Sequence, residues 1–143
     1  MDARTLTPRY SVTPQISVED VPAIAAAGFT TVICNRPDAE VPPSHQAATI
    51  REAVEAAGLQ FLELPLTHQT MTPENVAQQR NWIESAEGPI LAYCASGTRC
   101  SVVWSLGQVG SLSVEDIMTT TRDAGYDLSG LRPTLEALAA QEA

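Results

Sequence analysis

The residues that could do chemistry in this chain are gathered in one short stretch, Cys94-Ala95-Ser96-Gly97-Thr98-Arg99. The apolar run over residues 90–93 predicts a buried strand before this stretch, and residues 100–106 predict the first two turns of an apolar helix after it. A tight loop between a strand and a helix aims free backbone N–H groups at one point, which favours a bound anion. The sulfur of Cys94, at the end of the strand, is predicted to lie in this nest.

Arg99 ends the loop with a planar, permanently charged guanidinium group. The amides and this cation stabilise a thiolate over a thiol, so we expect the pKa of Cys94 to fall from about 8.5 to a value at which the sulfur is ionised at neutral pH. These features predict a cysteine nucleophile in a cradle for a tetrahedral oxyanion or a sulfur anion. Cys94 and Arg99 are therefore the predicted catalytic residues, and the anion is predicted to bind to the loop over residues 95–99.

This loop resembles the six-residue active loop of single-domain rhodaneses, and its surroundings resemble dual-specificity cysteine phosphatases. The chain as a whole is most similar to a small bacterial family that joins the two, the phosphatase-like domain of beta-lactamase-hydrolase-like proteins, whose members are also described as sulfurtransferases. The resemblance runs over residues 10–106 and rests on residues 11–16 (SVTPQI), 19–20 (ED), 28–33 (GFTTVI), 35–38 (NRPD), 57–59 (AGL) and 88–89 (GP). Two residues depart from the usual patterns: Tyr93 stands where most phosphatases have His, and Cys100 stands where the family usually has Ser or Thr.

The composition predicts one globular cytoplasmic domain over residues 1–143. Eight Arg, no Lys and 17 acidic residues give a net charge of −9, which argues against nucleic acid and anionic membranes as partners. Residues 1–10 lack the apolar segment of a signal peptide, and no apolar run approaches the roughly eighteen residues of a membrane span. Three Cys are an odd number and suggest reduced thiols. No His/Cys cluster has metal-ligand spacing and no glycine-rich nucleotide motif occurs, so we expect no cofactor.

Cap and turn signals predict the elements that position the loop. Strands are expected over residues 9–16, as a first edge strand, and over 30–34, 59–66 and 90–93. Helices are expected over residues 17–27, 44–57, 73–86, 100–109, 113–124 and 135–140, with Thr72 and Ser113 as the N-caps of the third and the fifth. The order predicts an α/β fold with a central, largely parallel sheet flanked by helices and a helical C-terminal layer, which resembles a cysteine phosphatase.

Turns at the carboxyl ends of parallel strands line the ligand crevice, which makes Arg36 and Asp38 candidates for the site. A solvated turn in which Asp38 caps locally explains them equally well. Trp104 is expected to be a core residue, Cys34 is expected to be an inert one, and His45 is expected at the surface.

The resemblance to phosphatases implies phosphoryl transfer from a phosphorylated substrate to Cys94, with the loop amides and Arg99 holding the equatorial oxygens. The phosphatase loop is one residue longer, however, and its chemistry needs a general acid. In such phosphatases an Asp supplies the proton, but residues 67–72 contain none. His68 or Asp38 could replace it, although neither matches the family position.

The rival prediction, which we favour, is sulfur transfer. Cys94 would take a sulfane sulfur from thiosulfate or a persulfide and hold it as a persulfide that the loop amides stabilise, with no general acid. A persulfide dioxygenase could work beside it. A third interpretation is a non-enzymatic redox module in which Cys94 and Cys100 form a disulfide. Cys100 could also act as a resolving thiol or simply replace a buried Ser, and Ser101 is a further auxiliary candidate.

Overall fold

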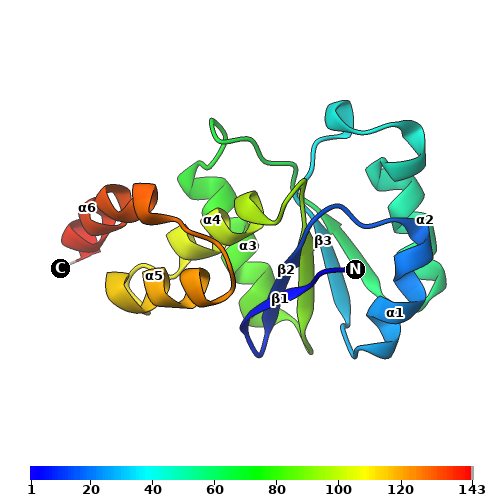
Figure 1. The fold of residues 1–143 in the computed structure, drawn as a ribbon, viewed down its shortest axis with the longest axis horizontal. Coiled ribbons are helices and arrows are strands. Elements are labelled where there is room, and N and C mark those ends of the chain that lie inside the picture. The colour runs from blue at the N-terminus through cyan, green and yellow to red at the C-terminus, as the bar shows by residue number, and fades with distance from the viewer. Residues whose placement is uncertain (143) are drawn as a thin grey trace.

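Residues 1–142, which the computed structural model describes, form a five-stranded sheet with helices on both of its faces (Figure 1). The strands are β1 (Arg4–Thr7), β2 (Tyr10–Thr13), β3 (Thr31–Cys34), β4 (Gln60–Glu63) and β5 (Ile90–Tyr93). Their order across the sheet is β1-β2-β5-β3-β4, and every neighbouring pair except β1 and β2 is parallel. The predicted α/β class with a largely parallel central sheet is therefore confirmed.

The helices lie in two groups, one on each face of the sheet (Figure 1). The α-helices are α1 (Val21–Ala26), α2 (Ala47–Ala56), α3 (Pro73–Ser85), α4 (Thr98–Gly107), α5 (Val114–Asp123) and α6 (Arg132–Glu142). Four short 3-10 helices precede three of the α-helices: η1 (Val18–Asp20) precedes α1, η2 (Asp38–Glu40) and η3 (Pro43–His45) precede α2, and η4 (Ser129–Leu131) precedes α6. Helices α1 and α2 lie on one face of the sheet, α3 and α4 lie on the other, and α5 and α6 lie beyond α4, so that α4 to α6 form the predicted C-terminal layer (Figure 1).

The prediction that residues 9–16 form an edge strand was wrong, because a strand that was not predicted lies outside it. β1 pairs with β2 in an antiparallel hairpin, so β2 is an inner strand between β1 and β5. Of the four residues of β1 only Leu6 is buried, and this half-exposed segment gives little hydrophobic periodicity. Its position depends on backbone pairing and on the Arg4 guanidinium, which donates to the carbonyl of Ala124.

Three predicted helices begin elsewhere than expected. α1 begins at Val21 after a 3-10 turn, because Pro22 fits only the first turn of an α-helix. α2 begins at Ala47, which leaves His45 in the preceding 3-10 turn. α4 begins at Thr98 and not at Cys100, so Arg99 lies within the first turn of the helix. The predicted N-caps Thr72 and Ser113 are confirmed, since their side chains accept from the N–H groups of Asn75 and Asp116.

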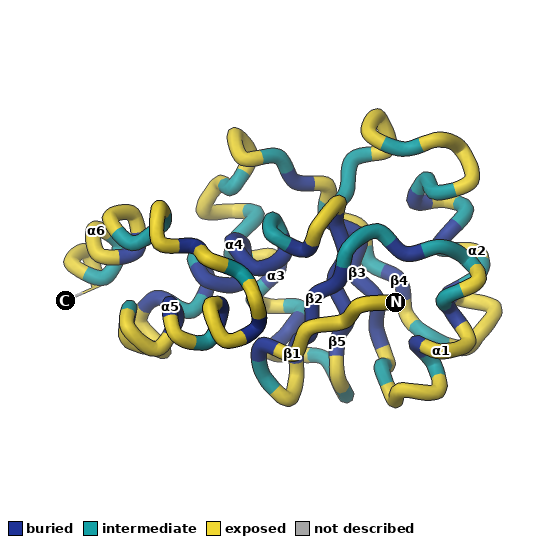
Figure 2. The backbone as a smooth tube through the Cα atoms, in the orientation of Figure 1, coloured by how far each residue is buried: buried dark blue, intermediate teal, exposed yellow. Residues whose placement is uncertain are grey.

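The core consists of two clusters of buried residues, and the central strand β5 contributes to both. In Figure 2 the buried residues, in dark blue, lie in the strands and in parts of the helices on both sides of the sheet. Because successive side chains of a strand point to opposite faces, Leu91 and Tyr93 pack with the α1/α2 cluster. Ile90, Ala92 and Cys94 join the cluster that contains α4 to α6. Trp104 belongs to this second cluster and is 2% exposed, as expected for a core residue.

Candidate active site

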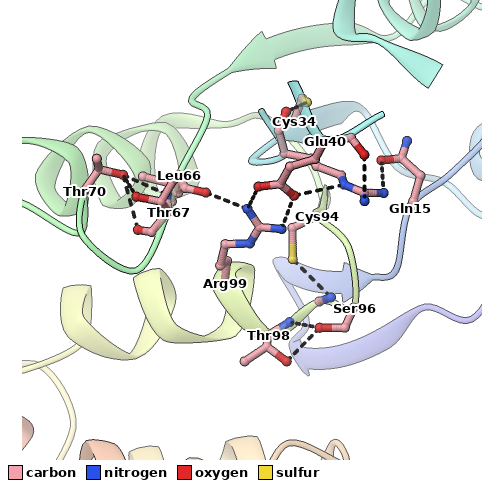
Figure 3. Close-up of polar contacts among 12 residues, drawn as sticks. Gln15, Cys34, Glu40, Leu66, Thr67, Thr70, Cys94, Ser96, Thr98 and Arg99 are labelled. Atoms are coloured by element: carbon pink, nitrogen blue, oxygen red, sulfur yellow. Dashed lines mark hydrogen bonds and ion pairs between the residues drawn. The ribbon is translucent and has the colours of Figure 1, made fainter. Parts of the chain in front are cut away.

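The predicted loop lies at the carboxyl edge of the sheet, where β5 ends between β2 and β3. Cys94 continues the face of β5 that packs against α4 and has no exposed surface. The backbone N–H of Gly97 donates to Cys94 Sγ across 3.1 Å (Figure 3). The strand, loop and helix therefore bring the sulfur into the predicted nest of amides.

Gly97 allows α4 to begin within the loop. Its φ of +93° lies in the left-handed region, where a side chain would be strained, and it is the N-cap of α4. Its carbonyl accepts hydrogen bonds from the N–H and the hydroxyl of Ser101, at 3.0 and 2.8 Å. Ser101 is fully buried and holds the loop backbone, so its place is structural support behind the nest.

Hydrogen bonds make the Cys94 sulfur strongly acidic. The largest cause is the Cys100 thiol, which donates toward it, and backbone N–H groups of Cys100, Gly97 and Ser96 add to this effect. Burial opposes them, but the net result lowers the pKa of Cys94 from 9.0 to about 5. Burial and the neighbouring thiolate raise the pKa of Cys100 well above its ordinary value. The two cysteines therefore differ in kind: Cys94 is a thiolate at neutral pH and Cys100 is a thiol that donates to it.

Arg99 is engaged by a residue that sequence analysis did not single out. Its guanidinium forms a bidentate ion pair with the carboxylate of Glu40, at 2.8 and 2.7 Å, and also donates to the carbonyl of Leu66 at 2.8 Å (Figure 3). These bonds fix the orientation of the Arg99 guanidinium at the site. Hydrogen bonds from Arg99 are also the main reason that the pKa of Glu40 is lowered, so this carboxylate is ionised at neutral pH.

Arg36 supports this ion pair from the other side. Its guanidinium donates to Glu40 Oε1 and to the Glu40 carbonyl, both at 3.3 Å, and to Gln15 Oε1 at 3.2 Å. Arg36 therefore contributes to the site through Glu40. The only feature of the sequence that could have indicated Glu40 as a site residue is its position shortly after β3. The carboxyl end of β3 lies at the edge of the sheet that also carries the Cys94 loop.

A cavity of about 340 Å³ opens beside the ion pair. Its walls are Glu40, Thr67, His68, Gln69, Ser96, Thr98 and Arg99. His68 thus faces the site, as one of the two predicted proton donors. His68 also lines a second, largely apolar cavity of about 570 Å³ bounded by α3, α4 and α6. Arg99 and Glu40 line this cavity, whereas Cys94 has no exposed surface and is not among the lining residues.

The remaining candidates are structural. Asp38 Oδ1 accepts from the N–H of Ala47 across 2.8 Å and so caps α2, which matches the alternative interpretation of a local cap. The Cys34 thiol is buried and donates to the carbonyl of Arg36, and burial raises its pKa. None of the three cysteines forms a disulfide.

A buried polar network behind the loop was not predicted. The Tyr10 hydroxyl donates to the carbonyl of Cys100 at 2.8 Å and accepts from the Gln79 amide at 3.2 Å. Gln79 and Asn35 exchange two side-chain hydrogen bonds of 2.9 Å, and Asn35 also donates to the carbonyl of Leu64. The network connects β2, α3 and the turn after β3 to the first turn of α4. Buried polar groups require such partners, so these residues fix the position of the loop.

Two further features, a metal-binding cluster and a membrane-spanning helix, are absent from the described part of the chain. Within residues 1–142, no three His, Cys, Asp or Glu side chains lie close enough together to hold a metal ion. None of the helices described here is both long and apolar enough to cross a membrane.

The known proteins that this chain matches in sequence share one description, beta-lactamase hydrolase-like. The family model described as "Beta-lactamase hydrolase-like protein, phosphatase-like domain" matches residues 2–111. A beta-lactamase hydrolase-like protein of Agrobacterium fabrum is 30% identical over 138 residues, which are 95% of this chain and 32% of that protein. A protein of the same description from Xylella fastidiosa is 26% identical over 93% of this chain and 31% of its own length. The chain thus spans about a third of the length of these relatives.

Solved structures show the same fold. The crystal structure of a proposed phosphatase from Neisseria meningitidis has 34% identity and a TM-score of 0.86, and the match covers 96% of this chain and 98% of that one. Pseudomonas aeruginosa TpbA, solved in complex with phosphotyrosine, has 17% identity and a TM-score of 0.65 over 94% of this chain and 90% of its own. At that identity, TpbA shows the fold alone. The family model, with the fold and the cysteine loop described above, shows that this chain belongs to the phosphatase-like domain family of the beta-lactamase hydrolase-like proteins.

Proposed function

We propose that this domain is a thiolate-based sulfurtransferase that forms a persulfide on Cys94. The observation that carries the proposal is the state of Glu40, which is the one carboxylate among the residues that line the cavity. Arg99 and Arg36 hold it ionised, so it has no proton to give to a leaving oxygen at neutral pH. Asp38 is engaged in capping α2. Sulfur transfer to a thiolate needs no such acid, whereas phosphoryl transfer does.

The reaction begins with the ionised Cys94 sulfur. With thiosulfate, the thiolate attacks the outer sulfur, a sulfur–sulfur bond forms on Cys94, and sulfite leaves with the electron pair of the broken bond. With a protonated persulfide, the thiolate takes the terminal sulfur and a thiolate leaves. With thiosulfate the Cys94 persulfide forms directly as an anion, and with a protonated persulfide it becomes one when its proton passes to the leaving thiolate. The loop N–H groups can then stabilise the charged outer sulfur as they stabilise the Cys94 thiolate. A persulfide dioxygenase is the kind of partner that would use such a product.

Phosphatase activity is the second candidate, and His68 is the observation that favours it. This side chain lines the cavity together with Arg99 and could protonate a leaving oxygen. The Neisseria meningitidis structure, described above as that of a proposed phosphatase, adds support because it shares the fold at 34% identity. In this alternative Cys94 attacks phosphorus and the loop amides hold the transferred phosphoryl oxygens. His68→Ala would then lower hydrolysis of an aryl phosphate, while leaving any sulfur transfer intact.

Intact mass spectrometry separates the two candidates. The wild-type protein incubated with thiosulfate or glutathione persulfide should gain about 32 Da, the mass of one sulfur, and cyanide should remove it as thiocyanate. Cys94→Ser should gain nothing. Hydrolysis of para-nitrophenyl phosphate by the wild type, with no sulfur adduct from either donor, would establish the phosphatase alternative and contradict sulfur transfer.

A further inference from the structure

The ion pair between Glu40 and Arg99 lies in the wall of the cavity beside the Cys94 loop. The carboxylate accepts one N–H from each terminal nitrogen of Arg99, at 2.8 and 2.7 Å, and the Leu66 carbonyl accepts another, which accounts for three of the five N–H donors of the guanidinium. Arg99 is 11% exposed at its side chain and Glu40 is 34% exposed, so the carboxylate lies on the solvent side of the pair. Cys94 has no exposed surface. An anion that enters the cavity and binds to Arg99 therefore binds beside a carboxylate.

The charges around the cavity are nearly balanced in this state. Arg99 and Arg36 contribute two positive charges, and Glu40 and the Cys94 thiolate contribute two negative ones. A cradle for a phosphate dianion gains from an excess of positive charge, because two negative charges must be brought beside a thiolate. Glu40 removes that excess. A ligand whose reacting head carries one charge, or none, meets less repulsion than a tetrahedral dianion.

Glu40 has a second cationic partner. Arg36 contacts both the Glu40 side chain and its carbonyl, and Gln15 holds Arg36 in turn. These contacts hold the carboxylate beside Arg99, where its charge acts on a ligand that binds to Arg99.

We propose that Glu40 is a specificity-determining residue that selects ligands of the Cys94 site by charge and disfavours tetrahedral dianions. This inference rests on the proposed sulfur transfer where it names a substrate class, since it favours a persulfide donor, with a singly charged head, over thiosulfate. The residue acts by offsetting the positive charge of Arg99 in the empty site and by repelling the second negative charge of a dianion in the filled one.

The test compares two anions of the same shape and different charge, sulfate and perchlorate. Each is titrated at constant ionic strength and neutral pH against alkylation of Cys94 by iodoacetamide, and the half-protecting concentration is measured. In Glu40→Gln, which is nearly the same size, sulfate should protect at about tenfold lower concentration, whereas perchlorate should change less than about threefold. Glu115→Gln removes a surface carboxylate that pairs with Arg132 far from the site, and it should change neither value.

Unchanged or weaker sulfate protection in Glu40→Gln would overturn the proposal, as would an absence of sulfate protection in every variant. An equal gain for both anions would also overturn it, because that result would mean a steric block without charge selection. The sulfur adduct is measured separately: Glu40→Gln should form it faster than wild type from thiosulfate, with little change for glutathione persulfide. If no donor gives an adduct while sulfate binding tightens, sulfur transfer fails and the charge selection stands.

Discussion

The hydroxyl of Tyr126 donates a hydrogen bond to the carbonyl of Ser96 across 3.0 Å, which joins the segment after α5 to the loop that carries Cys94. The same hydroxyl lies against the next residue, Gly97, where any Cβ atom would collide with it. The loop is therefore shaped by two constraints, the positive φ of Gly97 and the Tyr126 side chain. The C-terminal layer takes part in building the site as well as in completing the core.

Gly97→Ala should disable the site while the fold persists. An alanine there adopts left-handed backbone at a cost of roughly 1–2 kcal/mol and also strikes Tyr126. The Gly97 N–H then moves away from Cys94 Sγ, and the loss of one such donor should lower turnover at least about tenfold. Thermal unfolding and turnover are measured together. Gly130→Ala, where a Cβ meets nothing within 4 Å, should match the wild type in both, and equal activity of the two variants would contradict this role of Gly97.

Cys94→Ser should abolish the sulfur adduct and any turnover, since a hydroxyl at this position is not ionised at neutral pH. Cys34→Ala is the matched control, because Cys34 is also buried at the end of a parallel strand. Its thiol faces the other half of the core, so activity should be largely retained. Mass spectrometry of the adduct and circular dichroism check both variants. A comparable loss in folded Cys34→Ala would defeat the assignment of Cys94 as nucleophile.

Alkylation of Cys94 by iodoacetamide should rise with pH through about 5 and level off well below neutrality. Cys100→Ala removes the thiol that contributes most to this shift, so the midpoint should move to higher pH by about one unit. Cys100→Ser keeps a donor of similar size and should restore most of the acidity. Equal midpoints in wild type and Cys100→Ala, with folding retained, would show that the backbone amides alone hold the thiolate.

The lowered pKa of Cys94 also gives stability a pH dependence. Between about pH 9 and pH 5 the unfolded chain binds a proton at Cys94 that the folded chain does not. The contribution of this group to the free energy of unfolding is therefore complete above the unfolded pKa and is lost as pH falls through the folded one. Urea unfolding at a series of pH values gives the free energy of unfolding as a function of pH. In this window that free energy should rise less steeply with pH for Cys94→Ser than for wild type. Parallel curves for the two proteins would contradict the shift.

Arg99→Ala should remove anion binding at the site, and Arg99→Lys should restore it only in part, because an ammonium group lacks the bidentate fork. The measurement is protection of Cys94 from iodoacetamide by sulfate. Arg51→Ala is the matched control, because Arg51 also pairs with a glutamate, Glu63. Arg51 lies on α2, away from the Cys94 loop. Full protection by sulfate in Arg99→Ala would remove Arg99 from the anion site.

The local sequence determined the parts of this protein that depend on short-range physics. The apolar run before Cys94 and the caps Thr72 and Ser113 predicted β5, α3 and α5, because strand burial and helix capping are decided within a few residues. The alternation of strands and helices predicted the parallel sheet. The position of Cys94 between a strand and a helix predicted that backbone amides surround its sulfur. In the structure, N–H groups of neighbouring residues donate hydrogen bonds to this sulfur.

Only the tertiary structure decided what surrounds the loop. Glu40 meets Arg99 from 59 positions away, and Tyr126 meets Ser96 from 30 positions away, so no local pattern reports either contact. β1 was missed because an exposed edge strand is stabilised by backbone pairing with β2, which leaves little trace in the side chains. The local sequence specified a cysteine that can ionise, whereas the packing of distant segments decides which charged groups surround its loop.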